Sequence, residues 1–197
     1  YGRALAGASG NPQARIFVAF PLPGGGSITS NSLANLDAAT VQGAEVSALW
    51  RPLDGLEIGG SVTALDTEIE QAADASGGAN AATFNGKPLP FASDLSATLH
   101  ARQAWTLGGD MRLSLEAAAK YQSEYFLDAE GRNDRRQGPV TLIDAAARLA
   151  LADGTELSLW GRNLTDEDYA LSGYGFIGYD TFRSMPATWG ISVRVER

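Results

Sequence analysis

Apolar and polar residues alternate along residues 110–125, the stretch on which our prediction of the fold depends. The odd positions, from Met111 to Tyr125, are mostly apolar and end in aromatics, whereas most even positions, from Asp110 to Glu124, are polar or charged. Successive side chains of a β-strand point to opposite faces, so this pattern predicts a long strand with one apolar and one polar face. Helical spacing leaves no clean apolar stripe. The stretch exceeds the roughly 5–6 residues of an ordinary strand and suits a membrane-spanning strand of about 9–11 residues with an extension.

The same alternation recurs along the chain. It predicts further strands at residues 14–20, 40–50, 56–70, 93–105, 140–151, 156–163 and 187–196. Short turns at residues 51–55, 107–109 and 152–154 alternate with longer loops at residues 21–32, 71–90, 127–138 and 164–185. In an up-and-down meander all short turns lie at one end, as in outer-membrane barrels. The predicted fold class is therefore all-β: an antiparallel up-and-down meander of about eight long strands, part of a transmembrane β-barrel.

The face opposite the apolar one is polar in nearly every predicted strand. It carries Glu45, His100, Arg102, Arg112, Glu116, Lys120, Asp144, Arg148, Arg162 and Arg194. A small soluble barrel fills its interior with apolar side chains, and a Greek-key sandwich mixes long and short connections at both ends. The pattern thus favours a barrel with a polar lumen and lipid outside.

Composition and charge narrow the class of protein further. The 197 residues include no cysteine, which excludes disulfides and thiolate metal sites, and the net charge of -8 argues against nucleic acid as a partner. No apolar run is long enough for a transmembrane helix. Because the chain starts at Tyr1 without a methionine, we expect it to be a piece of a longer protein.

Four motifs, in order, resemble those of TonB-dependent outer-membrane receptors. Residues 157–170, LSLWGRNLTDEDYA, resemble a strand that runs into the family's N-L-x-D-x-x-Y signature, and residues 186–193, PATWGISV, resemble its closing strand. Residues 43–56 resemble its G-x-E strand and the following periplasmic turn, and residues 86–90, GKPLP, resemble its G-x-x-L-P segment. The family usually has another proline after that segment and an aromatic at its C-terminus, and both are missing here.

The resemblance implies one domain over residues 1–197, the C-terminal segment of a receptor barrel without its plug and N-terminal strands. The implied function is TonB-driven uptake of a scarce ligand, such as an iron–siderophore complex, across the outer membrane of a Gram-negative bacterium. The implied partners are outer-membrane lipid, the ligand, and TonB through the N-terminal part that this chain lacks. Two alternatives stay open: a self-closing eight-stranded structural or adhesive barrel, and a soluble carbohydrate-binding β-domain.

Few residues suggest chemistry of their own. No catalytic or phosphate-binding motif is present, so we expect no enzyme activity, cofactor or resident metal. The acidic positions 66, 68 and 70, or 128, 130 and 134, could ligate calcium, but a solvated rim and a charged loop are the simpler interpretations. His100 has no partner at catalytic spacing. Four aromatics in the second half of the last long loop would either stack on a ligand or pack the loop: Tyr174, Phe176, Tyr179 and Phe182.

Overall fold

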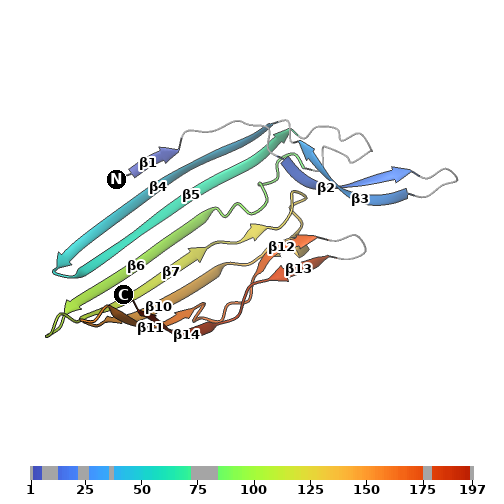
Figure 1. Ribbon diagram of the computed structural model, residues 1–197. Helices are drawn as coiled ribbons and strands as arrows, with labels where there is room; N and C mark the ends of the chain where they lie inside the picture. Colours follow the sequence, from blue (N-terminus) through green and yellow to red (C-terminus); the bar gives the residue numbers. More distant parts are fainter. Residues whose placement is uncertain are drawn as a thin grey trace.

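An antiparallel sheet of eight strands forms most of the structure, a computed structural model that describes residues 2–5, 13–21, 27–35, 38–71, 84–174 and 179–195 (Figure 1). Its strands, in spatial order, are β1 (Gly2–Leu5), β4 (Ala38–Leu53), β5 (Leu56–Gln71), β6 (Leu95–Thr106), β7 (Arg112–Gln122), β10 (Val140–Ala150), β11 (Thr155–Arg162) and β14 (Thr188–Val195). Within the described residues β1 and β14 do not pair, so the sheet is open. The predicted all-β antiparallel meander is confirmed. No helix among the described residues is long and apolar enough to cross a membrane.

The first strand of the sheet differs from the prediction. Residues 14–20 do lie in a strand, β2 (Gln13–Pro21), but β2 pairs with β3 (Ser27–Asn35) in a separate two-stranded sheet. The eight-stranded sheet, which we call the wall, begins instead with β1, which pairs with β4. Assigning residues 14–20 to the wall was therefore wrong, as was reading residues 27–32 as loop. Alternation identifies a strand, but it does not identify the neighbour with which that strand pairs.

Long and short connections lie at opposite ends of the sheet (Figure 1). The three short turns each contain a glycine with positive φ, at Gly55, Gly109 and Gly154. The longer connections have structure of their own: β8 (Tyr125–Phe126) pairs with β9 (Arg136–Gln137), with the short 3-10 helix η2 (Asn133–Arg135) between them, and β12 (Ala170–Tyr174) pairs with β13 (Asp180–Arg183). The strand predicted over residues 110–125 is shorter than expected, because β7 ends at Gln122 and the chain then turns into β8.

The sheet buries little of its apolar face. Its large apolar side chains are exposed, and Ile191, for example, keeps 73% of its accessible surface. The small cluster of buried residues Tyr125, Leu127 and Ala170 lies instead among the longer connections, which we call the outer connections. A soluble sheet would cover its apolar face, so this exposure fits a wall that meets lipid. At Asp66 the same face of β5 turns from apolar to acidic, which marks where that strand leaves the apolar zone.

Candidate functional site

Strand pairing brings the polar side chains of four neighbouring strands onto one face. Arg102 of β6 lies opposite Glu116 of β7, and Arg148 of β10 lies opposite Ser158 of β11. Directly paired residues point to the same side of a sheet, so these side chains share one surface. In a membrane barrel the polar face lines the lumen. We call this surface the lumenal face.

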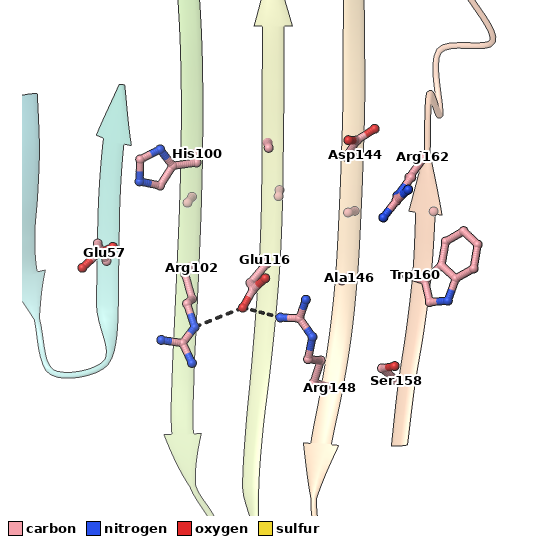
Figure 2. Close-up of a pocket in the computed structure, with 15 residues that line it drawn as sticks. Glu57, His100, Arg102, Glu116, Asp144, Ala146, Arg148, Ser158, Trp160 and Arg162 are labelled. Carbon is pink, nitrogen blue, oxygen red and sulfur yellow. Dashed lines mark ion pairs between the residues drawn. The ribbon is translucent and has the colours of Figure 1, made fainter. Parts of the chain in front are cut away.

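The centre of the lumenal face is an ion-pair cluster of two arginines and one glutamate (Figure 2). Arg148 Nη1 lies 2.5 Å from Glu116 Oε1, and Arg102 Nε lies 3.1 Å from the same oxygen. The three side chains come from three adjacent strands and remain partly exposed. We call them the Arg102–Glu116–Arg148 cluster. They line an open hollow of about 500 Å³.

Other charged groups around this hollow have partners of their own. Glu57 forms an ion pair of 2.6 Å with Arg51. Asp144 Oδ1 accepts a hydrogen bond of 2.8 Å from the backbone N–H of Asn163. The Arg162 guanidinium lies 5.7 Å from the ring centre of Trp160, a cation–π distance. Charged and aromatic groups therefore line the hollow together.

Two glycines let aromatic rings lie against the lumenal wall. The His100 ring occupies the space where a Cβ of Gly59, the residue opposite it, would project. The Trp160 ring does the same at Gly190, where an added Cβ would lie 2.6 Å from Cζ2. Larger residues at these glycines would push the rings into the lumen, so the glycines keep the hollow open.

A second cluster joins the outer connections. Arg135 Nη1 lies 2.8 Å from Asp128 Oδ2 and 3.1 Å from Glu130 Oε2, and its guanidinium carbon lies 4.7 Å from the ring centre of Tyr179. Burial, with a further contribution from the nearby Asp128 carboxylate, raises the pKa of Tyr179 to about 12. Asp128 and Glu130 pair with Arg135, and Asp134 pairs with Arg132, so these acidic residues form an arginine–carboxylate cluster, in agreement with the simpler interpretation of a charged loop.

The aromatics predicted to contact a ligand have different environments. Tyr179 packs inward against the buried residues Tyr125, Leu127 and Ala170. Phe182, in β13, has 58% of its surface exposed. Tyr174 ends β12 at the tip of the same hairpin, and Phe176 lies outside the described residues. The structure thus assigns a packing role to Tyr179, while ligand contact by any of the four stays a prediction.

The N-L-x-D-x-x-Y segment ties together the two ends of the last outer connection. Asn163 Nδ2 donates hydrogen bonds of 2.9 Å to the carbonyl of Glu167 and 3.0 Å to that of Met185, and its Oδ1 accepts one from the Glu167 N–H. Asp166 Oδ1 accepts a hydrogen bond of 2.8 Å from the N–H of Ala187. Both Asn163 and Asp166 have positive φ. The motif therefore closes the base of the connection where β11 ends and β14 begins.

The acidic positions of β5 lie at the outer rim, as the alternation indicated. Asp66 and Glu68 line a hollow together with Asp94, Glu124 and Arg136, among others. Glu70 accepts a hydrogen bond from the hydroxyl of Thr40. Within the part of the chain that the structure describes, no group of three or more acidic or histidine side chains is arranged to hold a metal ion. This geometry supports the interpretation of these acidic residues as a solvated rim.

Sequence reasoning placed Arg102, Glu116 and Arg148 on the polar face but did not bring them together. Strand parity gives the face of each residue, whereas contact also depends on the register between strands. The short turn at residues 107–111 sets the register of β6 and β7, so counting outward from it would have placed Arg102 opposite Glu116. A long connection joins β7 to β10, so the register that places Arg148 opposite Ser114, two pairs nearer the short turns than Glu116, could not be counted in this way. Arg135 was missed as a cluster residue because its partners lie in a loop and in a distant hairpin.

Comparison with known proteins identifies the family. Residues 10–164 match the family described as TonB dependent receptor-like, beta-barrel. No curated protein matches the chain in sequence. Among solved structures, the ferric yersiniabactin uptake receptor FyuA from Yersinia pestis is similar with a TM-score of 0.69 and 20% identity, over 84% of this chain and 24% of that one.

Two receptors from Acinetobacter baumannii have the same fold. The siderophore receptor PiuA gives a TM-score of 0.66 at 20% identity, over 89% of this chain and 23% of its own. The ferric preacinetobactin receptor BauA gives 0.61 at 18% identity, over 92% of this chain and 25% of its own. The chain thus spans about a quarter of the length of these receptors. With an open antiparallel wall, one polar face and a family match over most of its length, the chain belongs to the TonB-dependent receptor-like β-barrel family.

Proposed function

We propose that residues 1–197 are the C-terminal part of the barrel wall of an outer-membrane receptor that imports a scarce ligand with energy from TonB. The main support is the two-faced sheet, which has a charged lumenal face and an exposed apolar face, in a chain of this receptor family. The similar solved receptors are described as taking up or binding siderophores, so an iron–siderophore complex is the ligand class we propose.

In this proposal the chain supplies wall and outer connections and performs no catalytic step. The plug and the contact with TonB belong to a part of the receptor N-terminal to this chain, and the site of action is the outer membrane of a Gram-negative bacterium. Among the residues that the structure describes, β1 and β14 do not pair with each other, which supports part of a larger barrel over a self-closing one, because unpaired backbone groups in lipid cost several kcal/mol each.

Uptake by the intact protein that contains this chain tests the proposal. Cells that express it under iron limitation are given radioactive iron bound to catecholate, hydroxamate, carboxylate or phenolate siderophores. We expect accumulation with at least one class, and loss of accumulation but retained surface binding in cells without TonB. Accumulation independent of TonB, or recovery of the protein outside the outer membrane, would contradict the proposal.

We further propose that the β12–β13 hairpin contributes ligand contacts through its aromatics. Phe182 is the most accessible described candidate. The substitution Phe182→Ala should weaken surface binding of the transported siderophore severalfold. Leu171→Ala, at another exposed apolar residue of this hairpin, is the matched control and should leave binding unchanged. Equal effects of the two substitutions would indicate a general disturbance of the hairpin.

A further inference from the structure

The lumenal face is locally positive although the chain as a whole carries a net charge of -8. In the Arg102–Glu116–Arg148 cluster, two guanidinium groups share a single carboxylate oxygen. One carboxylate neutralises one guanidinium, so the cluster has one positive charge in excess. Among the described residues neither arginine has a second carboxylate within ion-pair distance.

Neighbouring carboxylates do not remove this excess. Glu57 lies opposite Arg102 in the register of β5 and β6, but its ion pair is with Arg51. Asp144 accepts a backbone hydrogen bond from Asn163, and a third guanidinium, that of Arg162, lines the same hollow. The hollow therefore presents guanidinium N–H groups to any group that enters the lumen.

Arginine chemistry defines what such a group would be. A guanidinium has five N–H donors in a planar fork that matches a carboxylate, and the arginines of the cluster meet Glu116 through Arg102 Nε and Arg148 Nη1 (Figure 2). We infer that the cluster is an anion-binding site of the lumenal wall, for a carboxylate or an anion of similar geometry. Glu116 holds the two arginines side by side, so it is a positioning residue.

Two sources could bring such an anion to the wall: a free anionic ligand in the lumen, or an acidic side chain of a segment of the same receptor enclosed by the barrel. The site depends on the barrel fold and not on the transport activity proposed above. Binding and coupling measurements therefore test it separately from uptake.

The first measurement uses citrate, a tricarboxylate, as the probe. Titration calorimetry on the intact receptor in detergent should show binding that is tenfold or more weaker in Arg102→Gln and in Arg148→Gln, because each removes a charge-assisted contact. Trimethyl citrate, which lacks the charges, should not bind. Lys120→Gln removes the same charge from the same face of β7 outside the hollow, and should bind citrate like the unaltered receptor.

The second measurement detects an acidic partner that already fills the site. The double variant Arg148→Lys with Glu116→Gln provides an amine and removes the carboxylate beside it. Zero-length carbodiimide coupling should then join residue 148 to a carboxylate of the receptor outside residues 1–197. Mass spectrometry of the coupled peptides identifies that carboxylate. Retention of the folded barrel is checked for every variant by its heat-dependent migration on gels. If Arg148→Gln does not assemble, Arg102→Gln decides the citrate test.

The outcomes separate clearly. Citrate binding that depends on both arginines but not on Lys120 supports the site and a free ligand, whereas coupling to an enclosed segment supports the site and a protein partner. If neither citrate binding nor coupling is observed, or if citrate binding falls equally in Lys120→Gln, the inference is overturned and the arginines only support Glu116. If the intact receptor binds citrate through the arginines but imports no siderophore-bound iron, the anion site stands and the proposed function is contradicted.

Discussion

The guanidinium of Arg135 lies 4.7 Å from the ring centre of Tyr179, and this contact joins two outer connections that are far apart in the sequence. Arg135 also pairs with Asp128 and Glu130 of its own connection. The side chains of Arg135 and Asp128 are 14% and 13% exposed, so this pair is largely shielded from water. The β8–β9 and β12–β13 hairpins are therefore held as one unit at the outer end of the wall.

Removing the Arg135 cation should loosen this unit. Arg135→Gln leaves two shielded carboxylates without their cation, at a cost of about 3 kcal/mol in local stability, the low end for a broken buried pair. Hydrogen exchange in the intact receptor should become faster in both hairpins. Arg132→Gln breaks the exposed pair with Asp134 and serves as the control, with no measurable change expected. Unchanged exchange in β12–β13 would show that the two connections are independent.

Tyr179 should make the same unit sensitive to alkaline pH. Its pKa is raised to about 12, first by burial and then by Asp128, whereas an unfolded tyrosine titrates near 10. Because the folded pKa is the higher one, the stabilising contribution is complete below about pH 10 and is lost as the pH rises towards 12. The phenolate absorbance of the receptor minus that of Tyr179→Phe should give the midpoint. A midpoint near 10 would contradict burial of this hydroxyl.

Alternation of polarity predicted most of the wall because each long strand has one lipid and one polar face. It could not find β1, since Gly2–Leu5 is too short to show a period. It assigned residues 14–20 to the wall because β2 has the same period, although β2 pairs with β3 in a separate sheet. Pairing depends on contacts between segments, and these are absent from a local pattern.

Alternation also predicted the polar face of the wall, but it did not predict which polar side chains form ion pairs. Arg102, Glu116 and Arg148 each lie at a polar position of an alternating strand, so their common face follows from parity. The outer cluster has no period. Arg135 reaches Asp128 only because β8 and β9 pair, and reaches Tyr179 only because a separate hairpin packs beside them.

Asn163 should be one of the most sensitive positions of the wall. It is 9% exposed, its side chain forms hydrogen bonds at both ends of the last connection, and its φ is +49°. Asn163→Ala should destabilise the folded receptor by roughly 2–4 kcal/mol, through unsatisfied buried groups and left-handed backbone strain. Asn163→Gly removes the strain and should cost about 1 kcal/mol less. Urea unfolding in bilayers measures both, and equal losses would exclude the backbone contribution.

The two faces of β7 should differ in their tolerance of charge. Leu115 lies on the apolar face, and Leu115→Arg should cost roughly 2–4 kcal/mol near the middle of the bilayer. The control is Ala118, an exposed lumenal residue opposite His100 and Asp144, because Ser114, next to Leu115 on the lumenal face, is only 6% exposed. Ala118→Arg should refold into bilayers like the unaltered receptor. Equal losses for the two substitutions would contradict the assignment of faces.

The outer connections should lie on the cell exterior and the short turns in the periplasm. Each strand of the meander crosses once, so connections alternate between sides, and here the three short turns share one end of the sheet (Figure 1). A peptide tag inserted at Asn133 of η2 in the intact receptor should be labelled by an impermeant reagent on whole cells. A tag at the turn of Asp153 and Gly154, or at Gly109, should be labelled only after the outer membrane is permeabilised. Labelling of either turn on whole cells would reverse the orientation of the wall, and the β12–β13 hairpin could then not meet a ligand that arrives from outside.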